Sequence, residues 1–356
     1  MEFHALSVAA IERQTRDCVA VTFAVPPALA DAYRFRAGQY VTLRTPIDGV
    51  AQRRSYSICA APHEGVLRVG IKRVPGGRVS TWANDSLKPG DVVDVGTPEG
   101  RFTPALDPAA SRAYLLVAAG SGITPILSIA KTILAEEPGS RVAMIYANKT
   151  VDSIAFREEV EDLKNRHMTR FSVAHVLSRE KQDTFLLDGR LDEAKLEGLA
   201  LALFDPAALH GVYLCGPLAM IETAKAALVR LGAAPAALHT ELFAAPDAAK
   251  PAGAPVPSAA RTGAARVTVI RDGIRQAFDV PFDGPSIVDA GLARGLEIPH
   301  SCKGGVCSTC RCLTRAGAVK MDVNYALEPW ELEKGFVLAC QAHPTTEEVV
   351  LDFDEA

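Results

Sequence analysis

Four cysteines near the C-terminal end of the chain have the spacing of an iron–sulfur site. They form a C-x4-C-x2-C pattern followed by one more cysteine, at Cys302, Cys307, Cys310 and Cys340. In plant-type proteins this spacing places four thiolates around a [2Fe–2S] cluster. Gly304 and Gly305 lie inside the loop, where we expect positive φ angles and amides close to the sulfurs. The spacing therefore predicts a [2Fe–2S] cluster with these four ligands.

Two other metal sites use similar ligands. Structural zinc also takes three or four cysteines, but zinc sites usually pair two C-x2-C units and this loop has one. A Rieske centre replaces two cysteines by histidines, and the chain has no Cys-x-His pair. Cys312 follows two residues after Cys310, and we predict that it packs in the strand leaving the loop. A [2Fe–2S] cluster carries single electrons, so another part of the chain must supply them.

A second group of residues could hold a flavin. It offers a cation for the pyrophosphate, an aromatic ring for the isoalloxazine and a hydroxyl near N5, in Arg54, Ser55, Tyr56 and Ser57. Because alternate residues of a strand share a face, Arg54 and Tyr56 would point one way and Ser57 the other. Alone, this motif also fits an exposed strand with one packed tyrosine.

Further candidate contacts to the flavin follow in the next stretch of chain. They are Val69, Ile71, Lys72, Gly77, Val79 and Ser80. We expect a helix to begin near Ser80 with its hydroxyl as the cap, and helix N-termini attract phosphate.

Two glycine-containing turns could hold a nicotinamide nucleotide. The first follows the apolar run 114–119 and contains Gly120, Gly122, Thr124 and Pro125. The second contains Cys215, Gly216, Pro217 and Met220. Open parallel sheets bind ligands over the carboxyl ends of their strands, so the two turns would flank one cofactor. Ser57 and Cys215 are then the candidate catalytic residues, although each turn alone also fits a tight connection without a ligand.

Composition and charge favour a globular electron carrier. The 356 residues are 48% hydrophobic and 22% charged. No long uncharged apolar run and no export signal is present, so we expect a soluble cytoplasmic protein that does not bind a membrane.

The charge is unevenly distributed along the chain. Residues 265–356 contain 9 Lys/Arg and 14 Asp/Glu, a net charge of −5, whereas residues 1–264 have a net charge of +1. This acidity favours a basic protein partner over nucleic acid, and it also serves solubility.

The sequence predicts different domains that position the candidate flavin, nucleotide and cluster residues. In residues 1–108, short alternating stretches between Gly and Pro turns predict an antiparallel β-barrel that binds flavin. In residues 109–243, strands alternate with helices, which predicts a doubly wound parallel α/β nucleotide domain. Residues 244–264 are rich in Ala, Pro, Gly and Ser, so we expect a partly mobile linker. Residues 265–356 contain the cluster loop and a predicted hairpin turn at Asp272-Gly273.

In this order, the motifs resemble the ferredoxin–NADP reductase superfamily with a fused plant-type ferredoxin. Segments 3–6, 33–39, 53–59, 302–307 and 324–329 are similar to those of the reductase subunits of phenylacetyl-CoA 1,2-epoxidase complexes. The resemblance implies a multidomain protein that ends in an α+β, β-grasp ferredoxin domain. It also implies electron flow from NADPH through FAD and the cluster to diiron oxygenase subunits in phenylacetate catabolism. The resemblance also implies that Phe243 binds a cofactor.

The family pattern also bears on the choice of nucleotide. In NADP-dependent relatives a Ser-Arg pair after the third strand of the sheet holds the 2′-phosphate, and here that pair is Ser178-Arg179. A guanidinium can bind phosphate bidentately, and Lys149 offers a second cation. We therefore expect a preference for NADPH over NADH. Arg179 and Lys149 also fit a weaker alternative, in which they are ordinary surface charges. Some reductases with this domain order use FMN in place of FAD.

Three functions remain compatible with the sequence. A nicotinamide gives two electrons as hydride, a flavin releases them singly, and a cluster accepts one at a time. The favoured function is therefore the NADPH-dependent reductase component of an epoxidase. A second is the reductase of another aromatic oxygenase or hydroxylase, because no segment identifies the acceptor. A third is a non-enzymatic adaptor that binds a cluster or zinc, against which the flavin and nucleotide motifs weigh.

Overall fold

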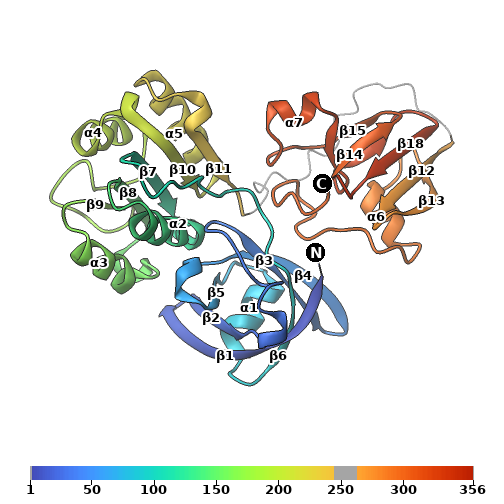
Figure 1. Ribbon diagram of the computed structural model, residues 1–356, viewed down its shortest axis with the longest axis horizontal. Helices are drawn as coiled ribbons and strands as arrows, with labels where there is room; N and C mark the ends of the chain where they lie inside the picture. Colours follow the sequence, from blue (N-terminus) through green and yellow to red (C-terminus); the bar gives the residue numbers. More distant parts are fainter. Residues whose placement is uncertain (1, 244–262, 356) are drawn as a thin grey trace. The chain divides into compact units, whose positions relative to one another are not determined.

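The computed structural model describes residues 2–243 and 263–355. These residues form two compact units, Met1–Glu241 and Leu242–Ala356, each with its own apolar core (Figure 1). The expected linker at 244–264 lies outside the described residues, except for its last two positions. In the described parts of the chain, no helix combines the length and apolar character that crossing a bilayer requires.

The first part of unit 1 is an antiparallel six-stranded barrel. Its strands are β1 (Phe3–Thr15), β2 (Cys18–Ala24), β3 (Tyr40–Ile47), β4 (Val50–Ser57), β5 (Leu67–Lys72) and β6 (Val92–Gly96). They are ordered β4-β3-β6-β1-β2-β5. An antiparallel bridge between Ile58 and Val69 connects the end of β4 to β5, so the two edge strands meet. The predicted barrel is confirmed, and it places the Arg-x-Tyr-Ser motif of β4 beside β5.

One local prediction in the barrel is wrong. Helix α1 (Arg78–Asp85) has Gly77 as its N-cap and no side-chain capping bond, so Ser80 does not cap it. The Ser80 hydroxyl lies inside the first turn, where it accepts from the Val74 amide at 3.2 Å and donates to the Gly77 carbonyl at 3.1 Å. The absence of a side chain at Gly77 makes this arrangement possible, because a Cβ there would lie 2.5 Å from the Ser80 hydroxyl oxygen.

The second part of unit 1 is a parallel sheet covered by helices. Its strands are β7 (Ala113–Ala119), β8 (Arg141–Asn148), β9 (Phe171–Leu177), β10 (Leu209–Cys215) and β11 (Leu238–Glu241). Its helices are α2 (Ile123–Glu136), α3 (Arg157–Arg166), α4 (Glu193–Leu203) and α5 (Leu218–Arg230). The strand order β11-β10-β7-β8-β9 makes β7 the point where the winding reverses. Figure 1 shows α2 and α3 on one face of the sheet and α4 and α5 on the other, as doubly wound sheets require.

Short 3-10 helices connect these elements. They are η1 (Pro27–Leu29), η2 (Pro62–Glu64), η3 (Gly120–Gly122), η4 (Val151–Ser153), η5 (Pro206–Ala208) and η6 (Pro235–Ala237). The first glycine turn is η3, which leads directly from β7 into α2.

Unit 2 is an α+β domain with a mixed sheet. Its strands are β12 (Ala264–Arg271), β13 (Ile274–Pro281), β14 (Arg311–Ala316), β15 (Val319–Met321), β16 (Phe336–Leu338), β17 (Ala342–Pro344) and β18 (Glu348–Asp352). The helices are α6 (Ile287–Leu292) and α7 (Pro329–Glu333). The five-stranded sheet has the order β13-β12-β18-β14-β16, in which only β12 and β18 are parallel. Asp272 and Gly273 have φ angles of 52° and 72°, so the predicted hairpin turn is confirmed.

Candidate functional site

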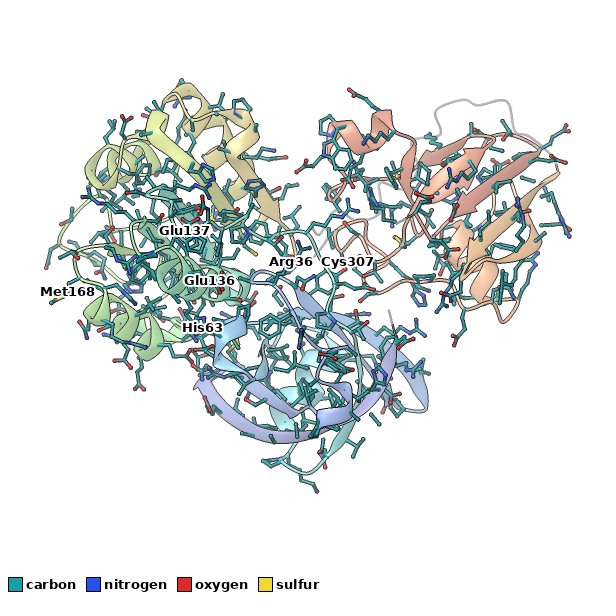
Figure 2. The ribbon with its side chains drawn as sticks, in the orientation of Figure 1. Arg36, His63, Glu136, Glu137, Met168 and Cys307 are labelled. Carbon is teal, nitrogen blue, oxygen red and sulfur yellow. The ribbon has the colours of Figure 1, made fainter. Side chains whose placement is uncertain are left out.

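The cluster loop between α6 and β14 brings the predicted thiols together. The Cys302 amide lies 3.5 Å from the Cys307 sulfur, and the Gly304 amide donates to the Cys302 sulfur at 3.3 Å. The Gln341 amide group donates to the Cys340 sulfur at 3.4 Å. A hydrogen bond from Cys307 lowers the pKa of Cys302, and hydrogen bonding with Cys302 raises the pKa of Cys307 and of Cys340. These sulfurs therefore form one interacting group, in the unit where Figure 2 labels Cys307.

The fourth thiol belongs to the same group, and Cys312 does not. Cys310 is buried and hydrogen-bonds to Cys340 through its side chain. Cys312 is fully buried on β14, with its sulfur 3.8 Å from the Val337 carbonyl, and burial raises its pKa well above the ordinary value. A neutral, enclosed thiol packs as a small apolar side chain, as the sequence predicts for Cys312.

The loop backbone is adapted to wrap the sulfurs. Gly305 has a φ of 73°, and a Cβ there would lie 3.2 Å from atoms of Val323. Lys303 and Ser308 also adopt left-handed φ angles, of 51° and 56°. The sequence predicts this role for glycines, but two positions with side chains share it. Gly304 contributes its amide to the Cys302 sulfur instead.

The close sulfurs match the ligand set of a two-iron cluster, in which four thiolates are shared between two irons.

In unit 1, three polar side chains from distant segments meet. The Ser57 hydroxyl at the end of β4 donates to the Glu241 carboxyl at the end of β11, at 3.2 Å. Burial raises the pKa of Glu241 to about 8, although the Ser57 hydrogen bond partly opposes it. Burial, with the nearby Glu241, raises the pKa of Cys215 well above its usual range. Cys215 is therefore a neutral thiol, and Ser57 and Glu241 form a pair that can hold a proton near neutral pH.

Sequence reasoning missed Glu241. It is the last residue of a four-residue strand beside Cys215, and β11 has too few residues to show periodicity. The available signal was a single acidic residue close before the Ala/Pro-rich stretch, which is too weak to assign a role.

The two glycine turns lie against each other. A Cβ on Gly122 would lie 2.1 Å from the Cys215 carbonyl oxygen, and one on Gly216 would lie 3.0 Å from the Ala119 Cβ. Both turns stand at the carboxyl ends of the neighbouring strands β7 and β10. The close approach explains why both positions are glycine and leaves bare backbone where a dinucleotide would lie.

The other residues predicted to bind the nucleotide make contacts within these two turns. Thr124 is buried, and its hydroxyl donates to the Ser121 carbonyl at 3.1 Å, while Pro125 is buried in the first turn of α2. Pro217 is the N-cap of α5, and a Cβ on Gly216 would lie 2.6 Å from the Met220 methyl group. These contacts hold the turns in shape.

The flavin candidates divide into accessible and enclosed groups. Arg54 is exposed, and Tyr56 packs partly against the barrel core. The Ser55 hydroxyl lies 3.1 Å from that of Thr42 on the neighbouring strand. The side chains of Val69, Ile71 and Val79 are buried in the protein, so only their backbone groups could reach a flavin.

Lys72 and Gly77 lie at accessible ends of their segments. The Lys72 ammonium lies 3.7 Å from the Asp17 carboxylate and 3.9 Å from where a Cβ on Gly120 would stand. Lys72 therefore joins the barrel side of the site to the first nucleotide turn. Gly77 precedes α1, at the end of a helix that favours anions.

The predicted phosphate-binding residues follow neighbouring strands. The amides of Ser178 and Arg179 donate to the carbonyls of Asn148 and Lys149, at 2.9 and 2.8 Å. Arg179 and Lys149 are exposed beyond the ends of β9 and β8. The Glu180 carboxylate accepts from the Val151 amide at 2.8 Å. Two cations thus stand side by side at the ligand-binding edge of the sheet.

The last predicted cofactor-binding residue is Phe243. It lies two residues beyond β11 and is 41% exposed.

Models of known domain families match three parts of the chain. Residues 5–103 match an oxidoreductase FAD-binding domain, and residues 116–226 match an oxidoreductase NAD-binding domain. Residues 269–345 match a 2Fe-2S iron-sulfur cluster binding domain. The chain is therefore a flavin- and nicotinamide-dependent reductase with a [2Fe–2S] domain, and the adaptor and zinc alternatives are wrong.

Two similar proteins align with this chain over nearly the full length of both partners. The chain is 42% identical over 354 residues to one of the subunits of the 1,2-phenylacetyl-CoA epoxidase of Escherichia coli (strain K12), in an alignment that covers 99% of this chain and 98% of that protein. It is 33% identical to the ferredoxin reductase component of 3-ketosteroid-9-alpha-monooxygenase from Rhodococcus rhodochrous, over 98% and 96% of the two chains.

A solved structure shares the overall organisation. Phthalate dioxygenase reductase, described as a modular structure for electron transfer from pyridine nucleotides to [2Fe-2S], aligns with a TM-score of 0.62 and 25% identity. The alignment covers 99% of this chain and 98% of that one. The order of barrel, nucleotide domain and cluster domain is therefore the same in both.

Proposed function

This chain belongs to the family of three-domain reductases that includes the matching component of 1,2-phenylacetyl-CoA epoxidase, and we propose that it supplies electrons to the oxygenase of such an epoxidase. The observation that carries this acceptor is the 42% identity over nearly the full length of both chains. The family resemblance supports a diiron protein as that oxygenase. It acts on the aromatic ring of phenylacetyl-CoA.

The site residues have distinct roles in this proposal. Arg54, Tyr56 and Lys72 hold the FAD, and the two glycine turns hold the nicotinamide nucleotide. Bound together, the nicotinamide, FAD and cluster supply hydride transfer and single-electron release. Cys215 packs beside the nicotinamide as an uncharged side chain, because its thiol is fully buried and protonated. Ser57 and Glu241 hold a proton beside the flavin, since they share a hydrogen bond and the pKa of the half-buried Glu241 carboxyl is raised.

The proposal also includes the identity of the cluster ligands and a preference for NADPH. The interaction of three sulfurs in the loop before β14 with the Cys340 sulfur after β16 supports ligation by Cys302, Cys307, Cys310 and Cys340. The adjacent cations Arg179 and Lys149 support NADPH over NADH, because the 2′-phosphate distinguishes the two nucleotides.

Reconstitution with defined oxygenases tests the acceptor. The purified holoprotein is mixed with NADPH, phenylacetyl-CoA and the oxygenase component of a phenylacetyl-CoA epoxidase, and the epoxide is measured by mass spectrometry. We expect product in proportion to NADPH consumed. Rapid reduction of cytochrome c without epoxide would contradict the proposal, because the reductase would then be active but have another partner.

A second acceptor is worth a parallel assay. The 33% identity to a 3-ketosteroid-9-alpha-monooxygenase reductase favours the oxygenase of that system as the alternative. Product formed only with the ketosteroid oxygenase would replace the first proposal by the second.

A further inference from the structure

Five charged side chains form a continuous row between the barrel and the nucleotide domain of unit 1. The Arg68 guanidinium lies 2.6 Å from both the Glu12 and the Glu159 carboxylates. The Lys131 ammonium lies 2.8 Å from Glu159 and 2.9 Å from Glu64. Barrel elements β1, β5 and η2 contribute Glu12, Arg68 and Glu64, and helices α2 and α3 contribute Lys131 and Glu159. Charges of opposite sign therefore alternate across the boundary between the domains.

We call Glu64, Arg68, Lys131 and Glu159 the interdomain latch. Its two cations are largely enclosed, with side chains only 9% exposed for Lys131 and 12% for Arg68. Burial alone would raise the pKa of Glu159, but Lys131 and Arg68 outweigh it and the pKa is lowered. Solvent screens such enclosed charges weakly, so the latch differs from ordinary surface pairs. Figure 2 labels His63, the neighbour of Glu64, on the side of the barrel next to α2 and α3.

The strand that carries the latch also reaches the cofactor site. Arg68, Gly70 and Lys72 alternate along β5 and therefore share a face. At Gly70 a Cβ would lie 2.5 Å from the Thr124 methyl group and 3.0 Å from the Phe156 ring. Thr124 lies just beyond the first nucleotide turn. One face of β5 thus runs from the latch, past the close approach of Gly70 to Thr124, to Lys72, over about 13 Å at 3.3 Å per residue.

Apolar contacts also cross this boundary. Barrel residues such as Ala20 and Cys59 share one core cluster with Ile126 of α2. Apolar burial is non-directional, so these contacts specify the relative orientation of the domains less sharply than ion pairs and hydrogen bonds do. One further directional contact is the Ser128 hydroxyl, which donates to the Ala60 carbonyl at 2.6 Å. Buried ion pairs add little net stability compared with apolar replacements, but they define one arrangement.

We propose that the interdomain latch positions the nucleotide domain on the barrel and thereby sets the approach of the nicotinamide to the flavin. Lys131 and Glu159 are positioning residues for hydride transfer, not catalytic ones, because they lie on the far side of Gly70 from the cofactor turns. A small rotation at the latch would move η3 relative to Lys72. Displacements near 1 Å at reacting atoms can reduce rates by roughly a hundredfold.

The test separates positioning from binding and folding. Lys131→Met keeps most of the side-chain volume and removes the charge that joins Glu64 to Glu159. We expect the limiting rate constant for flavin reduction by NADPH, measured by stopped flow, to fall roughly tenfold to a hundredfold. The FAD content and the NADP⁺ dissociation constant, measured by calorimetry, should change less than about threefold, because the binding residues are intact. Lys131→Arg, which keeps the charge, should restore most of the rate.

A matched control breaks an ion pair elsewhere in the nucleotide domain. Arg230 pairs with Glu193 and Glu197 between α4 and α5, away from the barrel boundary. Arg230→Met should leave the rate of flavin reduction unchanged. An unchanged rate in Lys131→Met, or an equal loss in Arg230→Met, would overturn the proposal, because the latch would then have no specific effect on hydride transfer.

A milder variant covers the case in which Lys131→Met fails to fold. Glu64→Gln removes one outer carboxylate and leaves the pair of Lys131 with Glu159. It should slow flavin reduction several-fold and increase amide hydrogen exchange in β5 and α2. Unaltered kinetics together with unaltered exchange in Glu64→Gln would count against the latch.

Discussion

At the scale of single residues, burial decides what each polar group can do. The same thiol chemistry gives three outcomes in this chain. Cys215 is neutral and fully enclosed, Cys312 is packed in the core, and Cys302 is held as the low-pKa member of a sulfur group. The Glu241 carboxyl shows the same dependence, because desolvation of this half-buried group raises its pKa to about 8.

Replacement of Cys340 by alanine should abolish the cluster. We expect the reduced Cys340→Ala protein to lose the EPR signal of the [2Fe–2S] cluster, because one iron would lack a thiolate. Cys312→Ala is the matched control and should retain the signal, since its sulfur faces Val337 in the core. A normal signal from Cys340→Ala would refute the proposed ligands.

Replacement of Arg179 should affect the two nucleotides differently. Charge-assisted hydrogen bonds to phosphate contribute about 1.5–3 kcal/mol. Arg179→Ala should therefore lower kcat/KM for NADPH by roughly tenfold to a hundredfold and leave that for NADH nearly unchanged. Steady-state assays with ferricyanide measure both without the physiological acceptor.

The control for Arg179 is Lys181, an exposed cation two residues further along the same loop. Lys181→Ala should leave the ratio of the two kcat/KM values unchanged. An equal fall for both nucleotides in Arg179→Ala would mean that Arg179 supports the loop. A wild type that prefers NADH would contradict the nucleotide assignment itself.

Glu241 predicts a specific dependence of stability on pH. Its carboxyl stays protonated in the folded protein up to about pH 8, whereas in the unfolded chain it ionises near its ordinary value of 4.5. The unfolded state therefore binds fewer protons between these values, and the free energy of unfolding falls as pH rises from about 4.5 to about 8. Thermal unfolding should show a smaller decrease over this range for Glu241→Gln. Identical pH profiles for the two proteins would show that Glu241 ionises normally.

At the scale of elements, strand ends assemble the site. The carboxyl ends of β7 and β10 bring two glycine turns together, and β4 and β11 bring Ser57 to Glu241. Each element places its functional residue at its last position or just beyond it. For β7, β10 and β11, this is the region of an open parallel sheet where backbone groups are free to meet a ligand.

Gly122 should tolerate no side chain. The Cβ of Gly122→Ala would stand 2.1 Å from the Cys215 carbonyl oxygen, a backbone atom that cannot turn away. Overpacking of this kind costs about 1–3 kcal/mol, and it would separate the two turns. We expect a lower melting temperature and NADP⁺ binding weakened by at least about tenfold. Ser121→Ala in the same turn is the control, and normal binding in Gly122→Ala would show that the turns can separate without effect.

At the scale of the whole molecule, charge is divided between the parts. Residues 265–356 have a net charge of −5, while residues 1–264 have a net charge of +1. The part that contains the cluster domain is therefore the part whose encounters with another protein depend most on electrostatic steering.

Salt should slow electron transfer to a cationic acceptor. Raising ionic strength from about 0.01 to 0.1 M shortens the Debye length from about 30 to about 10 Å. The rate of reduction of cytochrome c, a basic protein, should fall several-fold over this range, because attraction to the acidic domain is screened. Ferricyanide is an anion, so its reduction should not slow. A parallel decrease with both acceptors would show that salt acts on the enzyme and not on the encounter.

The sequence alone determined the parts whose signal is local. The C-x4-C-x2-C loop, the Arg-x-Tyr-Ser strand, the two glycine turns and the Asp272-Gly273 hairpin each depend on residues adjacent in the chain. Their chemistry and backbone requirements are set by neighbours a few positions apart, so the three domains and their cofactors could be predicted.

Only the tertiary structure decided the features that depend on distant segments. Glu241 lies 184 positions from its partner Ser57, and no pattern in either segment indicates the contact. The latch likewise combines residues of four separate elements into one row of charges. Ser80 shows the same limit locally, because its position inside α1 follows from how the preceding turn packs. Burial and long-range proximity arise when the chain folds, and they set the pKa of Glu241 and the proposed register of the two domains.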